Sequence, residues 1–182
     1  MNDRTAFPRS SLILVGHSGA GKTTLAELLG KRTGLAVVEV GHIVIGEADR
    51  LGVVALDHAD RLFQARQFLH FVQQVAGGHR CGRPLIIVGP RVFEEILYLK
   101  DVYGPSFVVA LTAPVDLREA RRVDLILPID DNLSRLRQRD AVEDHWDLQR
   151  TIRSANLVLD SAQQPLVLAA TVERAWRAFD ER

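Results

Sequence analysis

The feature that most constrains this chain is a glycine-rich loop between a short apolar run and a helical pattern. Residues 12–15 are all aliphatic, and the next eight residues match the phosphate-binding pattern G-x-x-x-x-G-K-S/T from Gly16 to Thr23. Apolar residues then recur at helical spacing between Leu25 and Leu29. A strand, a glycine-rich loop and a helix in this order form the context in which the pattern binds phosphate. The sequence therefore predicts a site for a nucleoside triphosphate.

The chemistry of such a loop assigns a role to each of its residues. Glycines let the loop wrap closely, so that backbone N–H groups point at phosphate oxygens, and the following helix N-terminus favours the anion. Lys22 is expected to reach the β- and γ-phosphates, and the Thr23 hydroxyl to ligate Mg²⁺. An accidental glycine turn that carries a lysine is the alternative, and the full match in its proper context disfavours it. The expected nucleotide contacts are Gly16, Ser18, Gly19, Ala20, Gly21, Lys22, Thr23 and Thr24.

Composition excludes several classes of function. The 182 residues suit a single domain spanning 1–182, and Lys+Arg and Asp+Glu both total 23, which disfavours a nucleic-acid or acidic-membrane surface. One cysteine, Cys81, excludes an internal disulfide framework and a four-cysteine zinc site. No apolar run approaches the length of a membrane span, and none precedes Leu12 as a secretory signal would. We expect a cytoplasmic protein.

Short apolar segments alternate with helical patterns along the chain. Five of them are typical of buried strands: 11–15, 35–40, 84–88, 107–111 and 156–159. This alternation predicts an α/β fold, a three-layer α/β/α arrangement whose parallel sheet places ligands at the C-terminal ends of its strands. Residues 114–139, with their arginines and Pro128, are expected to form a small helical lid, and helical signals continue from Leu133 to Ile152.

Together with the phosphate loop, four further segments resemble the P-loop nucleotide kinases. The chain looks most like the small adenylate-kinase-like and dephospho-CoA-kinase-like proteins, from Leu12 to Ser161. This resemblance implies the strand order 2-3-1-4-5, the use of ATP and Mg²⁺, and phosphoryl transfer to a nucleotide-like acceptor such as a nucleoside monophosphate or dephospho-CoA. The segments that carry it are Gly41–Ile43, Gly89–Glu95, Arg139–Trp146 and Ser154–Asp160.

The resemblance also implies arginines that bind the transferring phosphoryl group. Arg118, Arg121, Arg122 and Arg139 lie in the matching lid segment, and Arg91 follows the third strand at the edge of the site. Their role would be to neutralise the phosphoryl oxygens and exclude water. A solvated helix face is the alternative for each lid arginine. The expected catalytic residues are Lys22, Arg91, Arg118, Arg122 and Arg139.

Departures from the family pattern lie on the acceptor side. Gly41-His42 and Ile45 stand where the family has Gly-Asp and an arginine, and Val88 stands where it has an acidic residue after the third strand. Valine can neither accept a proton nor hold a metal-bound water. A nucleotide-binding regulatory or structural module with a degenerate acceptor site is therefore the alternative to a kinase. A GTPase is disfavoured because none of the three lysines lies in an Asn-Lys-x-Asp motif.

Overall fold

A five-stranded parallel sheet forms the centre of the molecule. The computed structural model describes residues 8–40, 83–121 and 129–182. The strands pair in the order β2-β3-β1-β4-β5, and every pair is parallel. The predicted α/β class and the strand order 2-3-1-4-5 are thereby confirmed. The strands are β1 (Ser11–Val15), β2 (Val37–Glu39), β3 (Ile86–Val88), β4 (Ser106–Thr112) and β5 (Leu157–Asp160).

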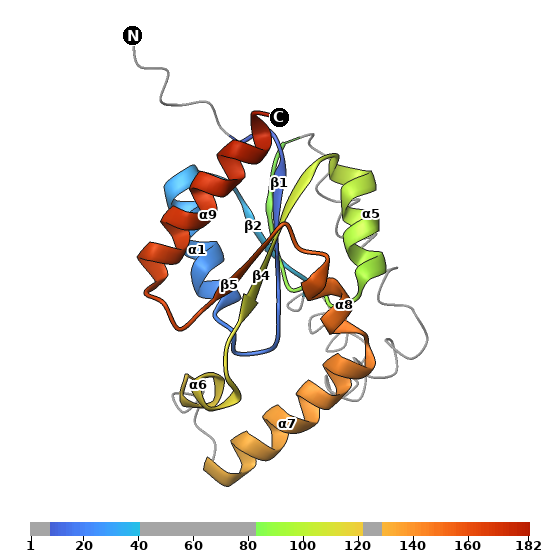
Figure 1. The fold of residues 1–182 in the computed structure, drawn as a ribbon, viewed down its shortest axis with the longest axis vertical. Helices are drawn as coiled ribbons and strands as arrows, with labels where there is room; N and C mark the ends of the chain where they lie inside the picture. The colour runs from blue at the N-terminus through green and yellow to red at the C-terminus, as the bar shows by residue number, and fades with distance from the viewer. Residues whose placement is uncertain (1–7, 41–82, 122–128) are drawn as a thin grey trace.

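Helices cover both faces of the sheet and one of its ends. Figure 1 shows α1 and α9 on one face and α5 on the other, while α6 and α7 lie beyond the C-terminal ends of the strands. This end is also where the loop after β1 lies, as expected for ligand sites in parallel sheets. The described helices are α1 (Lys22–Thr33), α5 (Phe93–Tyr103), α6 (Val115–Ala120), α7 (Ile129–His145), α8 (Leu148–Arg153) and α9 (Pro165–Asp180).

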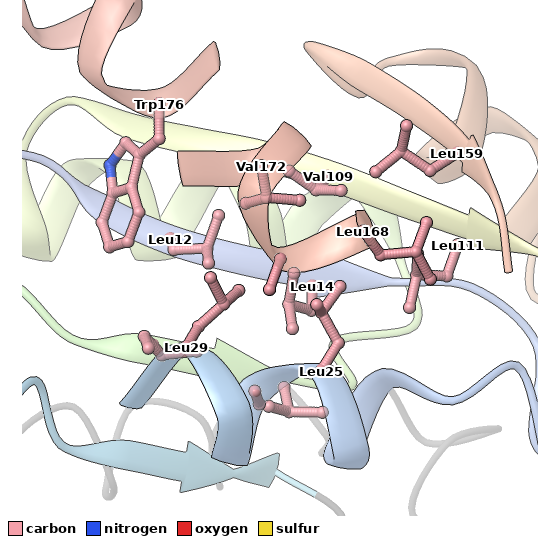
Figure 2. Packing of buried hydrophobic residues seen from close by; sticks show 14 of the residues in the cluster. Leu12, Leu14, Leu25, Leu29, Val109, Leu111, Leu159, Leu168, Val172 and Trp176 are labelled. Carbon is pink, nitrogen blue, oxygen red and sulfur yellow. The ribbon is translucent and has the colours of Figure 1, made fainter. Parts of the chain in front are cut away.

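Alternating side chains of β1 divide the core into two layers. Leu12 and Leu14 pack toward α1 and α9, whereas Ile13 and Val15 pack toward α5 and α8. All four are fully buried, and burial of such a side chain contributes about 1.5–3 kcal/mol to folding. Figure 2 shows leucines of β1 and α1 meeting Val172 and Trp176 of α9 in the first layer. Since both faces of the strand are buried, its sequence is continuously apolar.

The region from residue 133 to residue 152 contains a break where the sequence predicted continuous helix. The expected helix from Leu133 to Ile152 is two helices, because α7 ends at His145 and α8 begins at Leu148. Asp147 between them has φ 57°, a left-handed conformation that a helix cannot contain. The break lets Leu148 and Ile152 of α8 pack against the face of the sheet that α5 covers, while α7 crosses the end of the sheet. Within the described residues, no helix is both long and apolar enough to cross a membrane.

Candidate nucleotide site

The loop after β1 has the conformation that its glycines predict. Gly16, with φ +132°, lies so close to β4 that a Cβ would stand 2.1 Å from the carbonyl oxygen of Leu111, so only glycine fits. Gly19 and Gly21 have φ of +80° and +86°, a left-handed region that other residues rarely adopt. Helix α1 begins directly after Gly21. The loop therefore wraps around the N-terminus of α1, as an anion-binding loop must.

Lys22, the first residue of α1, folds back beneath the loop. Its Nζ donates hydrogen bonds to the carbonyl oxygens of Gly16 and His17, each at 2.7 Å. Burial is the main cause that lowers the pKa of Lys22 to about 8; Glu143 opposes this shift, and the positive charges of Arg91, Arg139 and Arg118 add to it. Lys22 thus lies against two loop carbonyl oxygens and near three arginines, and its contact with the β- and γ-phosphates stays a prediction.

The first turn of α1 offers the hydroxyl that the loop pattern assigns to Mg²⁺. Thr23 and Thr24 are exposed there, while Ala20 is fully buried under the loop. The residues fit a magnesium nucleotide on this side, since Thr23 is an exposed residue in the first turn of α1. On the neighbouring strand, Val88 ends β3 beside Leu14 of β1 and is 3% exposed. Val88 itself supplies no carboxylate, and the residue paired with it on the other side is Glu39 of β2.

Glu143 of α7 is the site residue that the sequence reasoning missed. Its Oε2 accepts a hydrogen bond from the backbone N–H of Ser18 at 3.1 Å. Its Oε1 accepts from Nη1 of Arg91 at 2.5 Å and lies 3.5 Å from Nε of Arg139. The available signal was the four-residue spacing from Arg139 to Glu143, which places both on one face of a helix. One carboxylate therefore joins the phosphate loop to two of the predicted catalytic arginines.

The electrostatics around Glu143 are strongly cationic. Burial alone would raise the pKa of this carboxyl group, but the approach of His17 and the charges of Arg91, Lys22 and Arg139 lower it to about 2. For Arg91, a cation, burial lowers the pKa, and the negative charge of Glu143 opposes that change. Glu143 is 2% exposed, so solvent does little to screen these charges.

Arg118 is bound on all sides by the protein. Its guanidinium makes a two-pronged contact with Asp140 of α7, at 2.7 and 2.6 Å. It also donates to the carbonyl oxygens of Ser18 at 3.1 Å and Ala113 at 3.2 Å. A Cβ on Gly19 would lie 3.2 Å from the Arg118 side chain. Arg118 therefore clamps α6, the phosphate loop and α7 together in this conformation.

Two of the remaining predicted arginines lie in the described part of the structure, and one lies outside it. Arg121 donates to the Ser161 hydroxyl at 2.9 Å and to its carbonyl at 2.5 Å, beside Gly21 at the start of α1. Arg139 is one-third exposed on α7 and faces Glu143. Arg122 lies outside the described residues, as do the acceptor-side departures His42 and Ile45.

A buried carboxyl group fixes the turn that carries Arg91. Glu95 of α5 accepts hydrogen bonds through Oε2 from the backbone N–H groups of Arg91, at 2.5 Å, and Val92, at 3.1 Å. It is fully buried, its Oε1 has no hydrogen-bond partner among the described residues, and burial raises its pKa to about 8. This arrangement fixes the backbone from which the Arg91 side chain reaches α7.

Three donors next to the loop lie close enough together to hold a metal ion: His17, Asp140 and Glu143. Nδ1 of His17 is 3.3 Å from Glu143 and 3.7 Å from Asp140, and within the described part of the chain it makes no hydrogen bond of good geometry. Both carboxylates, however, already pair with arginines, and a divalent cation there would face several positive charges. The cluster is better described as the negative half of an ion-pair network.

Comparison with known families agrees with this geometry. Residues 11–173 match the profile of a family described as an AAA domain. The chain belongs to this family. Over 110 residues this chain is 27% identical to the UPF0200 protein PAE1629 of Pyrobaculum aerophilum, covering 60% of this chain and 63% of that protein. The chain thus spans less than two thirds of the length of this relative.

Solved structures with the same fold include several kinases. A sugar kinase from Janibacter has a TM-score of 0.65 at 18% identity, covering 93% of this chain and 95% of that one. A gluconokinase from Sinorhizobium meliloti has a TM-score of 0.64 at 17% identity, covering 96% and 95%. A shikimate kinase from Aquifex aeolicus has a TM-score of 0.58 at 12% identity, covering 92% and 96%. This chain therefore has the fold of P-loop kinases, which confirms the predicted resemblance to that group.

Proposed function

We propose that this AAA domain is an ATP-dependent kinase that transfers the γ-phosphoryl group to a small molecule. The observation that carries the proposal is the gathering of cationic side chains from three parts of the chain at one end of the phosphate loop. Lys22 comes from α1, Arg91 from the turn after β3, and Arg139 from α7. The positive charges of all three lower the pKa of Glu143. Phosphoryl transfer depends mostly on such positioning and charge stabilisation.

Each residue has a distinct role in the proposed transfer. The loop N–H groups and Lys22 bind the β- and γ-phosphates, while Arg91 and Arg139 neutralise the oxygens of the phosphoryl group in flight. Thr23 would hold Mg²⁺, which supplies further neutralisation of the phosphates when bound. Arg118 holds α6 and α7 against the loop, and Arg122 belongs to the same proposed lid. Water exclusion by this lid, approximately residues 114–139, protects ATP from hydrolysis.

The acceptor that we propose is a small, nucleotide-like molecule that carries a phosphate. Arg91 supports an anionic acceptor, because its guanidinium follows the third strand and can pair with phosphate in two-pronged fashion. Shikimate and gluconate, which give their names to the similar kinases, carry carboxylates and are the natural competitors for this position. Nucleoside monophosphates and dephospho-CoA remain the preferred class.

A second candidate function is a nucleotide-binding module without turnover. Val88 favours it, because an apolar side chain that is 3% exposed ends the strand where an acidic residue would orient a metal-bound water. Such a module would bind ATP through the same loop and use it as a structural or regulatory ligand. The two functions differ in whether any acceptor stimulates ADP formation.

ADP release from Mg-ATP, measured with the full chain and a panel of acceptors, tests the proposal. The panel contains nucleoside monophosphates, dephospho-CoA, shikimate, gluconate and small alcohols. Stimulation by one compound, lost in Lys22→Ala, supports the kinase and names its acceptor class. Tight ATP binding with no stimulation by any compound favours the non-catalytic module.

A further inference from the structure

The carboxylate of Glu143 occupies the centre of the proposed phosphoryl site. One of its oxygens accepts the backbone N–H of Ser18, inside the phosphate loop. The other oxygen lies against the guanidinium groups of Arg91 and Arg139. These are the partners that the loop pattern and the arginine cluster offer to a phosphate group. Glu143 therefore uses hydrogen-bond donors that a bound phosphoryl group would need.

The position of this carboxylate along the loop indicates which phosphate it replaces. Lys22, which reaches the β- and γ-phosphates in loops of this pattern, is among the charges that act on Glu143. Arg91 comes from the turn after β3, and Arg139 comes from α7, which lies beyond the C-terminal ends of the strands in Figure 1. An anion held between the loop and these arginines corresponds to the terminal phosphate, not to the α- and β-phosphates that the helix N-terminus cradles.

We propose that Glu143 stands in for the γ-phosphate in the nucleotide-free protein and thereby makes the site discriminate between nucleoside triphosphates and diphosphates. The proposal rests on the proposed function, because it uses the same phosphate loop. When a diphosphate binds, Glu143 keeps its contacts with Ser18, Arg91 and Arg139. A triphosphate must displace it, and the charge-assisted bonds that are lost lower the affinity for the triphosphate.

Displacement has a second consequence on the acceptor side. In the present conformation Arg91 is paired with Glu143, and its guanidinium lies 5.4 Å from the centre of the Trp146 ring. When the γ-phosphate takes the place of the carboxylate, Arg91 exchanges a protein anion for a substrate anion. Glu143 is thus a specificity-determining residue, because the binding of ATP decides whether Arg91 pairs with Glu143 or with a substrate anion.

Alternative roles for this carboxylate fit its surroundings less well. A general base must take up a proton near neutral pH, whereas a carboxylate among Lys22, Arg91 and Arg139 holds its charge to about pH 2. A metal ligand would need free lone pairs facing solvent or phosphate. Both oxygens of Glu143 instead face N–H donors.

Calorimetric titration of the full chain with ATP and with ADP, each with Mg²⁺, tests the proposal. In Glu143→Gln the ratio of ATP affinity to ADP affinity should rise at least tenfold over wild type, because the neutral amide no longer competes with the γ-phosphate. Glu94→Gln is the matched control, since Glu94 of α5 is 63% exposed and pairs with Arg150, which is 53% exposed. That variant should leave the ratio unchanged.

The outcomes separate this proposal from the proposed function. If wild type binds neither nucleotide, the nucleotide site itself is wrong. If wild type binds both and Glu143→Gln leaves the ratio unchanged, Glu143 does not stand in for the γ-phosphate, while the kinase proposal survives. Glu143→Asp, which keeps the charge but shortens the side chain, should raise the ratio by less than Glu143→Gln does.

Tryptophan fluorescence of the wild-type chain gives a second test, which does not depend on whether a variant folds. Trp146 lies beside Arg91, whereas the only other tryptophan, Trp176, is 1% exposed in the core and gives a constant signal. The imido analogue of ATP, which is not hydrolysed, should change the emission of Trp146, and ADP should change it little. Equal changes with both nucleotides would overturn the proposal.

Discussion

At the scale of single residues, the site consists of charged groups whose pKa values are moved by burial and by one another. Lys22 and Glu95 show the two directions of this effect. Burial lowers the pKa of the Lys22 ammonium to about 8, and burial raises the pKa of the Glu95 carboxyl group to about 8. In both cases the protein disfavours the charged form. Each shift leads to a pH dependence that can be measured.

Lys22 is expected to make nucleotide affinity fall above pH 8. Below this value the ammonium is charged and attracts the phosphates; above it, the free protein loses this charge, and affinity should drop by about tenfold per pH unit. Calorimetric titration with Mg-ATP between pH 7 and pH 9.5 measures the effect. Lys22→Met should bind at least about 100-fold more weakly and with no such dependence. A wild-type affinity that stays constant to pH 9.5 would show that Lys22 does not contact the phosphates.

Glu95 is expected to make folding stability fall as pH rises from about 4.5 to about 8. The unfolded chain ionises this carboxyl group near 4.5, but the folded chain keeps it protonated to about 8, so the unfolded state binds fewer protons in this window. Glu95→Gln should remove this loss and gain at least about 1 kcal/mol relative to wild type between pH 5 and pH 8. Urea denaturation of both proteins at the two pH values measures it. Parallel curves would contradict the prediction.

At the scale of elements, one ion pair joins α6 to α7 beside the phosphate loop. Arg118 of α6 binds Asp140 of α7 with both ends of its guanidinium while donating to the loop carbonyl of Ser18. Arg118 is 5% exposed, which protects this pair from screening by solvent. The two helices therefore depend on each other for their position at the loop.

A double-mutant cycle between Arg118 and Asp140 should show a coupling energy of about 2 kcal/mol. Arg118→Ala and Asp140→Ala each lose the same pair, so the double variant should be little worse than either one. Equilibrium unfolding of the four proteins measures the coupling. Glu94 and Arg150, an exposed pair at 3.7 Å, form the control cycle and should couple by less than about 0.5 kcal/mol. Additive effects at Arg118 and Asp140 would show that they act independently.

Element by element, the sequence allowed accurate prediction where local patterns decide the structure. The continuously apolar strands and the loop from Gly16 to Thr23 were placed correctly, because burial on both faces and glycine geometry leave clear signals. The break at Asp147 was missed, since an aspartate in a polar helical pattern gives no local sign of a left-handed backbone. Glu143 was missed for a different reason. Its role depends on partners that are distant in sequence, Ser18 and Arg91.

At the scale of the whole molecule, α9 joins the end of the chain to the first strand. Trp176 packs in the layer between α1, α9 and the sheet, and its Nε1 donates to the Ser10 hydroxyl at 2.8 Å. Ser10 in turn donates to Asp180 at 2.5 Å. This network supports β1, and β1 carries the phosphate loop.

Trp176→Ala should therefore destabilise the protein by about 4 kcal/mol, because it opens a cavity in the core and leaves the Ser10 hydroxyl without its donor. Thermal and urea unfolding measure the loss. Affinity for Mg-ATP, measured well below the unfolding transition, should stay within about threefold of wild type if the core only supports the loop. Leu166→Ala is a control at an exposed apolar position of α9, which is 62% exposed, and should cost less than about 1 kcal/mol.

Phosphorus-31 NMR of Mg-ATP with the full chain and each compound of the acceptor panel tests the central claim most directly. The account predicts that one compound gains a new phosphate ester resonance in step with ADP formation, and that Lys22→Ala abolishes both. ATP that is bound but stays intact with every compound, or gives only ADP and inorganic phosphate, would contradict the kinase proposal.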